Sequence, residues 1–92
     1  MKKDYKKIHR SVINLLKNDG YTIKHIEKPT EEMQLMSVKN NGWAIQYIKD
    51  PSEEVKLEAV KGNPWLIGYT ANPTEKVKKL VKEELRKIRE QY

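Results

Sequence analysis

Hydrophobic and aromatic positions recur along this chain at a fixed spacing. Trp43 and Trp65 stand 22 positions apart, and Tyr47 and Tyr69 share that spacing. Tyr21 occupies the place that matches Trp43 one period earlier. A self-match of this kind over three copies is typical of proteins that stack one small structural unit. The sequence therefore predicts three repeat units, which cover residues 19–40, 41–62 and 63–84.

Each unit is expected to contain two short helices. In the middle unit the positions i, i+1, i+4 and i+5 form one face of a first helix, and they are occupied by Trp43, Ala44, Tyr47 and Ile48. A second helix follows the next proline, and its apolar side is formed by Val55, Leu57, Ala59 and Val60. Alternating residues in this second segment would also fit a strand, but the aromatic spacing and the capping residues favour helices.

Equivalent positions of the units are expected to pack against one another, because stacking buries the apolar side of each repeat. This predicts that the core between repeats consists of Tyr21, His25, Trp43, Tyr47, Trp65, Tyr69, Leu35, Leu57, Val38 and Val60. His25 takes the place that tyrosine holds in the later units. It is therefore interpreted as a partly buried packing residue, and not as a catalytic group.

Polar residues and glycine mark the ends of the predicted helices. Asp19, Asn41 and Asn63 precede the first helix of each unit, and such side chains favour the N-cap position. Pro64 suits the first position of a helix, where no backbone N–H is needed. Gly62 is expected at the C′ position, just beyond the end of a second helix.

Two assignments remain open for the start of the second helices. In the middle unit Asp50 could be the N-cap, with proline at N1 and Glu53 at N3 as in a capping box. Ser52 could equally be the N-cap, which would start the helix two residues later. Asn72, Glu75 and Thr74 offer the same choice in the last unit.

The two ends of the chain are predicted to form helices with one apolar stripe and otherwise charged surfaces. The stripe of an N-terminal helix, over residues 4–18, contains Tyr5, Ile8, Val12, Leu15 and Leu16. That of a longer C-terminal helix, over residues 73–90, contains Val77, Leu80, Val81, Leu85 and Ile88. Polar outer faces are needed at the ends of a repeat array, where no neighbour covers them. The predicted fold is thus an all-α solenoid.

Composition adds limits on the kind of protein. The 92 residues suffice for one small domain, and the formal net charge is +6. The positive excess lies in the two terminal segments, so it does not by itself predict a basic groove. The chain has no cysteine, hence no disulfide and no thiolate metal site, which fits a reducing cytoplasm. Neither a membrane span nor a signal peptide is expected.

Residues with catalytic potential all have a structural interpretation. His9 lies on the basic first helix with no evident partner, and two histidines without cysteine make a poor metal site. Glu31, Glu53 and Glu75 recur with the repeat, and helix capping accounts for them. The sequence contains no phosphate-binding loop and no nucleophile motif. We therefore expect no enzyme activity, no catalytic residue, no metal and no cofactor.

Two sets of polar positions are candidate binding residues, because stacking would align each set on one surface. The first set is Gln34, Lys56 and Lys78, extended by Lys82; the second is Lys24, Gln46 and Gly68. A row of lysines could bind an acidic protein surface or a phosphate. A solvated face with no ligand is the alternative interpretation. The aromatic residues could stack on nucleotide bases, but their repeat positions favour a packing role.

The segment NGWAIQYIKDPSEEVKLEAV resembles a helical repeat family of unknown function. That family occurs in tandem copies in proteins of large DNA viruses, tailed phages and some protists. The resemblance covers residues 19 to about 82, and it departs in the third unit, where Gly68 replaces Gln46. It implies an all-helical repeat fold and a phage or viral origin, and it assigns no catalytic residue.

Three hypotheses about function follow. The first is a non-catalytic module that binds a host protein and inhibits or redirects it, in the host cytoplasm if the origin is viral. The second is an anion binder that takes nucleic acid or sequesters a nucleotide signal through lysines and aromatic rings. The third is a structural or homo-oligomer-forming component of a particle. The salt dependence of binding separates the first two, because contacts to phosphate weaken steeply with salt.

Overall fold

The structure, a computed structural model, describes residues 5–70 and 72–91. All regular elements in these residues are helical, which confirms the all-α prediction. They are four α-helices and three 3-10 helices, the latter labelled η. In chain order they are α1 (Tyr5–Asn18), η1 (Gly20–His25), α2 (Glu31–Asn40), η2 (Gly42–Tyr47), α3 (Glu53–Gly62), η3 (Pro64–Tyr69) and α4 (Glu75–Glu90).

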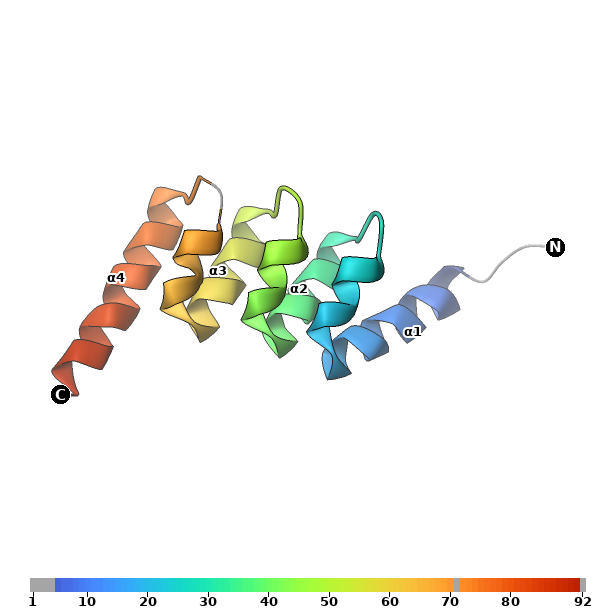
Figure 1. Cartoon of the computed structure of the whole chain (residues 1–92), viewed down its shortest axis with the longest axis horizontal. Helices are drawn as coiled ribbons and strands as arrows, with labels where there is room; N and C mark the ends of the chain where they lie inside the picture. The colour runs from blue at the N-terminus through green and yellow to red at the C-terminus, as the bar shows by residue number, and fades with distance from the viewer. Residues whose placement is uncertain (1–4, 71, 92) are drawn as a thin grey trace.

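The helices form a row of side-by-side units (Figure 1). Each unit is an η helix followed by an α helix, and α2, α3 and α4 begin 22 residues apart, at Glu31, Glu53 and Glu75. Successive α helices contact one another, as do successive η helices, so the row has an α layer and an η layer. The molecule measures 59 × 25 × 17 Å. This elongated arrangement is compatible with the predicted short solenoid, in which α1 extends the α layer at the N-terminal end.

The first helix of every unit is a 3-10 helix and not an α-helix. Its backbone bonds join residues three apart, such as the Ala44 N–H to the Asn41 carbonyl (2.9 Å) and the Ile48 N–H to the Ile45 carbonyl (3.0 Å). With three residues per turn, Ile45 and Ile48 share a face, and both are buried. Trp43 points about 120° away from that face. The tighter helix therefore turns the aromatic side chain outward.

The predicted caps of the η helices are confirmed. The side chains of Asp19, Asn41 and Asn63 accept hydrogen bonds from the backbone N–H two residues ahead, and Pro64 lies in the first turn of η3. Asn41 also caps the end of α2, because its own N–H donates to the Ser37 carbonyl (2.9 Å). One residue thus ends an α helix and starts the next η helix, which leaves almost no freedom between them.

The α helices use the later of the two predicted caps. Ser52 Oγ accepts the Val55 N–H at 3.3 Å, and Thr30 and Thr74 do the same for α2 and α4. The alternative caps were wrong: Asp50 and Asn72 lie in the turns before the helices, with left-handed φ angles of 56° and 50°. Asp and Asn tolerate this conformation better than most residues. The last helix accordingly starts at residue 75 and not at 73.

The proposed C′ role of Gly62 is also wrong. This glycine is the last residue of α3, and the glycines with a left-handed φ that such a cap requires are absent from the described residues. The extended residue Asn63 ends the helix instead, because it has to start η3 at the same time.

The cap hydroxyls also join neighbouring units. Ser52 Oγ donates to Glu31 Oε1 of the preceding unit at 2.5 Å, and Thr74 Oγ1 donates to Glu53 Oε1 at 2.6 Å. Each hydroxyl therefore accepts a bond from its own helix and donates one to the carboxylate of the helix before it. The repeated glutamates thus have a structural role beyond the first turn of their own helix.

Ser52→Ala is expected to destabilise the protein by about 1–2 kcal/mol, because it removes both the cap of α3 and the bond to the preceding unit. Urea unfolding followed by circular dichroism measures the change. Ser11→Ala is the matched control, since Ser11 is exposed and bonds only to the Lys7 carbonyl of its own helix. Equal unfolding free energies for the two variants would contradict this role of Ser52.

The core lies between the α layer and the η layer, and it consists of small and branched aliphatic side chains. Its larger cluster contains Leu16, Ile23, Val38, Ala44, Ile45, Ile48, Val55, Ala59 and Leu66, and a second cluster contains Val60, Val77 and Val81. Val38 and Val60 are buried as predicted, whereas Leu35 and Leu57 are half-buried at the edge. The isoleucines of the η helices were not predicted, because an α-helical period places them off the buried face.

The two terminal helices bury less of their apolar stripes than the sequence predicted. On α1, Leu16 is buried, but Ile8 and Leu15 are 51% and 57% exposed, and Ile13 is buried instead. The reason is that, among the described elements, α1 packs only against α2 and η1, which leaves part of its apolar surface without a described neighbour. Ile88 near the end of α4 is exposed as well. Residue 4 of the predicted helix and the side chain of Tyr5 lie outside the described part of the structure.

Candidate functional site

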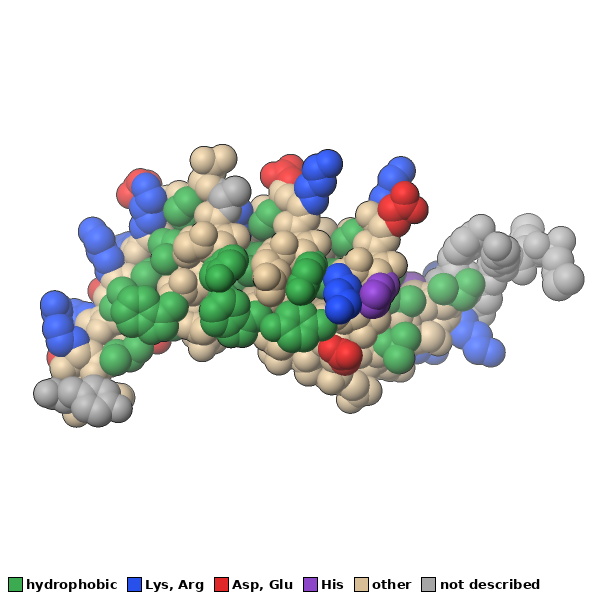
Figure 2. Space-filling view, viewed as in Figure 1, with side chains coloured by type: hydrophobic (Ala, Val, Ile, Leu, Met, Phe, Trp, Pro, Cys, Tyr) green, Lys and Arg blue, Asp and Glu red, His purple; other side chains and the backbone are tan. Residues whose placement is uncertain are grey.

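The aromatic residues of η2 and η3 form an exposed row on the η layer, which we call the aromatic row. Trp43, Tyr47, Trp65 and Tyr69 are 40%, 45%, 68% and 52% exposed. Figure 2 shows hydrophobic side chains gathered in a band along this face of the molecule. The prediction that these four residues form a buried core is therefore wrong. The outward turn of the 3-10 helices is the cause.

The rings nevertheless contact one another between units. Tyr21 meets Tyr47 edge to face, with ring centroids 5.8 Å apart, and Trp43 meets Tyr69 in the same way at 5.3 Å. Such pairs contribute about 0.5–1.5 kcal/mol beyond the area they bury. Each pair joins the first aromatic position of one unit to the second aromatic position of the next. Trp65 has no such ring contact among the described residues, because no further η helix follows it.

Trp65 borders a groove along the C-terminal half of α4. The groove is also lined by Lys82, Glu83, Leu85, Arg86, Ile88 and Arg89. Leu85 and Ile88 give it an apolar floor, and Lys82 and Arg89 make no ion pair within the described residues. The most exposed tryptophan thus lies beside apolar and cationic side chains. Tryptophan and arginine are the residues most enriched at energetic centres of protein interfaces.

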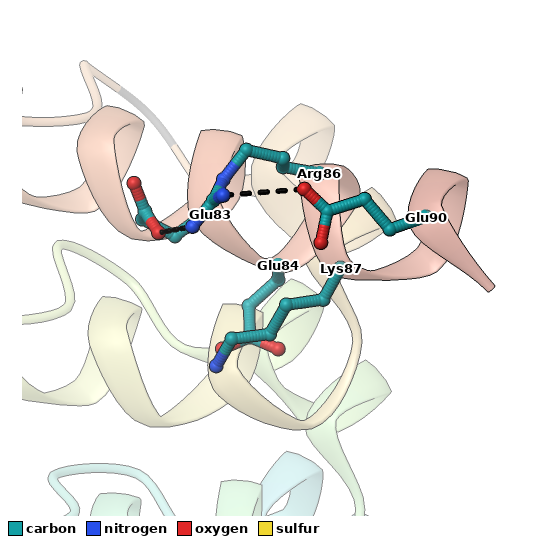
Figure 3. A network of polar contacts seen from close by, with 5 residues as sticks. All are labelled: Glu83, Glu84, Arg86, Lys87 and Glu90. Atoms are coloured by element: carbon teal, nitrogen blue, oxygen red, sulfur yellow. Dashed lines mark hydrogen bonds and ion pairs between the residues drawn. The ribbon is translucent and has the colours of Figure 1, made fainter.

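An ion-pair network fixes the charged side of this groove (Figure 3). Arg86 bridges Glu83 at 2.8 Å and Glu90 at 3.2 Å, and Lys87 pairs with Glu84 at 3.6 Å. The hydrogen bond and the positive charge of Arg86 hold the pKa of the Glu83 carboxyl below its ordinary value. These groups are exposed, so their main effect is to orient Arg86 and to support the last turns of α4.

The first predicted binding row is aligned by the stacking, but its members make contacts of their own. Gln34 Nε2 donates to the Pro29 carbonyl (3.1 Å), and Lys56 Nζ donates to the Asn72 carbonyl of the next turn (3.4 Å). Lys78 pairs with Glu75 at 3.3 Å. The bonds of Gln34 and Lys56 hold the turns between helices, whereas the Lys78 pair lies within the first turn of α4. The row as a ligand site stays a prediction, whereas Lys82 lies in the groove beside Trp65.

The second predicted row is exposed. Lys24, Gln46 and Gly68 occupy the same position in η1, η2 and η3, and each is open to solvent. Because successive η helices contact one another, these positions follow the η layer together with the aromatic row. The side chains differ in charge and size, so the row changes from cationic to uncharged along the molecule.

Both histidines differ from their predicted roles. His25 is exposed and does not pack in the core, since the η helix turns this position outward as it does Tyr47 and Tyr69. His9 has a partner: its Nε2 lies 2.8 Å from Glu32 Oε2 on α2. The pair joins α1 to α2 at the surface. Within the described residues no group of three His, Asp or Glu side chains is placed to hold a metal ion.

Comparison of the chain with protein-family models, curated proteins and solved structures finds no match. The resemblance to the helical repeat family therefore depends on its sequence motif alone. Among the described residues, no helix has both the length and the apolar character that crossing a bilayer requires. The geometry that carries functional information is the exposed aromatic row and the groove at its end.

Proposed function

We propose that this protein is a non-catalytic binding module that recognises a partner protein through the aromatic row. The supporting observation is the exposure of four large aromatic side chains in one row, on a domain with no equally large apolar residue in its core. Tryptophan and tyrosine side chains supply a large contact area to a partner, and covering them costs little conformational entropy. The family resemblance suggests a host protein as the partner, which the module would inhibit or redirect.

The proposal is tested by binding with a purified partner. The tagged protein is incubated with a nuclease-treated bacterial lysate, washed at high salt, and the retained protein is identified and purified. Its dissociation constant is then measured with the wild type and with Trp43→Ala/Trp65→Ala. We expect the double variant to bind at least about tenfold more weakly, because truncation of central tryptophans commonly costs 2 kcal/mol or more.

The matched control is Lys6→Ala/Arg10→Ala, which truncates two exposed residues of α1. It should leave the affinity unchanged. If the tryptophan variant retains full affinity, the aromatic row is not the contact surface. Circular dichroism melting of both variants shows whether either is unfolded at the temperature of the binding assay. The tryptophan variant should melt at a somewhat lower temperature, because it loses the contact between Trp43 and Tyr69.

A second candidate function is binding of a single-stranded nucleic acid or a nucleotide. The observation that favours it is the proximity of Trp65 to Lys82 and Arg89, since an exposed ring and cations together suit a base and its phosphate. Titration with a fluorescent oligothymidylate tests it. Binding that falls steeply between about 50 and about 200 mM salt would favour this function over a protein interface.

A further inference from the structure

A second groove lies on the α layer. It has a volume of about 740 Å³ and is lined only by residues of α2, α3 and α4. Its floor consists of the half-buried Leu35, Leu57 and Leu80, one from each helix. These leucines pack on the two core clusters from outside. The groove is therefore a continuous apolar surface that crosses three helices.

The rim of this groove is positively charged. Lys39, Lys76 and Lys79 line it and form no ion pair within 4 Å in the described structure. Two of the acidic residues on the rim are engaged: Glu58 with Lys61 at 4.0 Å, and Glu83 with Arg86. Glu54 is the remaining carboxylate. The lining holds four lysines and three glutamates in all. With the Glu58–Lys61 and Glu83–Arg86 pairs set aside, three lysines remain against Glu54, a modest positive excess that favours an acidic occupant.

The spacing of the leucines suits an α-helix lying across the row. Packed helices have axes about 8–10 Å apart, so Leu35 and Leu57, which hold the same place in α2 and α3, are separated by about that distance. Leu80 lies one residue beyond that place in α4. Seven residues of an α-helix rise about 10.5 Å and return nearly to the same face. A helix with an apolar residue at every seventh position would therefore place one side chain near each leucine.

An extended peptide fits this groove less well. Its backbone N–H and C=O groups would need partners when covered. The lining has only leucine, lysine and glutamate side chains, with no amide or hydroxyl, and the lining backbone is α-helical, so its own N–H and C=O groups are bonded within the helices. A helical occupant satisfies its own backbone, which removes that cost.

A second copy of this chain is disfavoured by charge. Among the described helices, α1 leaves two aliphatic residues exposed, Ile8 and Leu15, and α4 leaves one, Ile88. Helix α1 is therefore the stronger candidate, and it carries Lys6, Arg10 and Lys17 and has no acidic residue in its first turn. Docking it on a rim of lysines would place like charges together, which costs several kcal/mol at an interface. The occupant is therefore a different, acidic chain.

We propose that the groove over Leu35, Leu57 and Leu80 binds an acidic amphipathic α-helix of another protein, with apolar residues about every seven positions. The groove shares no residue with the aromatic row, although Glu83 also lines the groove beside Trp65. The inference does not depend on the proposed role of the aromatic row, and the two are tested by different variants.

The test uses two synthetic helical peptides of about sixteen residues, long enough to cross three helices. Both have leucine at every seventh position with alanine beside it. The other positions are glutamate in one peptide and lysine in the other. Fluorescence anisotropy of the labelled peptides measures binding to the whole protein. We expect the acidic peptide to bind and the basic peptide not to bind.

Lys76→Glu/Lys79→Glu should lower the affinity for the acidic peptide at least about tenfold, because two attractive contacts become repulsive. The same variant should allow the basic peptide to bind. Both lysines are exposed, so folding is not at risk. Lys28→Glu/Lys49→Glu makes the same change of net charge outside the groove and should leave the acidic peptide bound. The proposal is overturned if neither peptide binds, if both bind equally, or if the two charge-reversal variants behave alike.

Discussion

Gly20→Ala is expected to be strongly destabilising, by about 2–4 kcal/mol. A Cβ atom at Gly20 would lie 2.3 Å from the Ser37 carbonyl oxygen and 3.2 Å from Asn40 Oδ1. The backbone cannot easily move away, because the Gly20 N–H donates to Asn40 Oδ1 (2.7 Å) and the Gly20 carbonyl accepts from Ser37 Oγ (2.7 Å). The clash would separate η1 from α2 or break both bonds.

Urea unfolding of Gly20→Ala and Gly62→Ala gives a matched comparison. A Cβ at Gly62 would meet nothing within 4 Å, and this glycine lies in the last turn of α3. Alanine there should be neutral or stabilise by up to about 1 kcal/mol, because it favours the helix. The close approach of η1 to α2 would be refuted if Gly20→Ala were as stable as the wild type.

Leu66→Ala should cost about 2–5 kcal/mol, the range for a fully buried leucine. Leu66 is 0% exposed and packs in the larger core cluster, to which it is the contribution of η3. The same place in the earlier units holds Thr22 and Ala44. Leu66→Ala should therefore weaken the packing of the third unit against the second. Leu15→Ala, at an exposed leucine of α1, should change the unfolding free energy by less than about 0.5 kcal/mol.

The effect of Leu66→Ala is expected to be coupled to the effect of a substitution at Gly42. A Cβ at Gly42 would lie 2.7 Å from Leu66 Cδ1 and 3.3 Å from the Ala59 carbonyl oxygen. Gly42→Ala should therefore cost less in a Leu66→Ala background than in the wild type, since the nearer clash is gone. Additive costs in a double-mutant cycle would show that the two residues do not share this space.

The parts of the fold that sequence predicts well are those decided by local chemistry. Asn41 and Ser52 bond to backbone N–H groups within three residues of themselves, so a local motif suffices to find them. The period of the array is visible for a similar reason, because every unit repeats the same local contacts. The choice between Asp50 and Ser52 as cap remained open, since both residues are good caps and the turn geometry decides between them.

The orientation of the aromatic residues could not be predicted from the same pattern. Large aromatic side chains at a fixed period usually indicate a core, and an α-helical period places Trp43 with Ala44. The segment is too short to favour an α-helix strongly, and the 3-10 turn buries Ile45 in place of the indole. The repeat pattern identified the aromatic residues, but it predicted that they lie in the interior.

The groove on the α layer could not be predicted from the sequence either. Leu35 and Leu57 were expected to be interior, and the sequence made no prediction about the acidic and basic residues around them. Only the stacking shows that Lys39 from α2 and Lys79 from α4 face the same hollow. The distance between these two lysines in the chain leaves no local signal of their proximity.

The one-residue junctions between the helices have a consequence for how such a protein can diversify. Since Asn41 and Asn63 fix the entry of each η helix in the same way, the exposed positions keep their geometry whatever side chain they hold. Lys24, Gln46 and Gly68 already show three different chemistries at one such position. The exposed side chains can therefore change one unit at a time, while the packing beneath them is left intact.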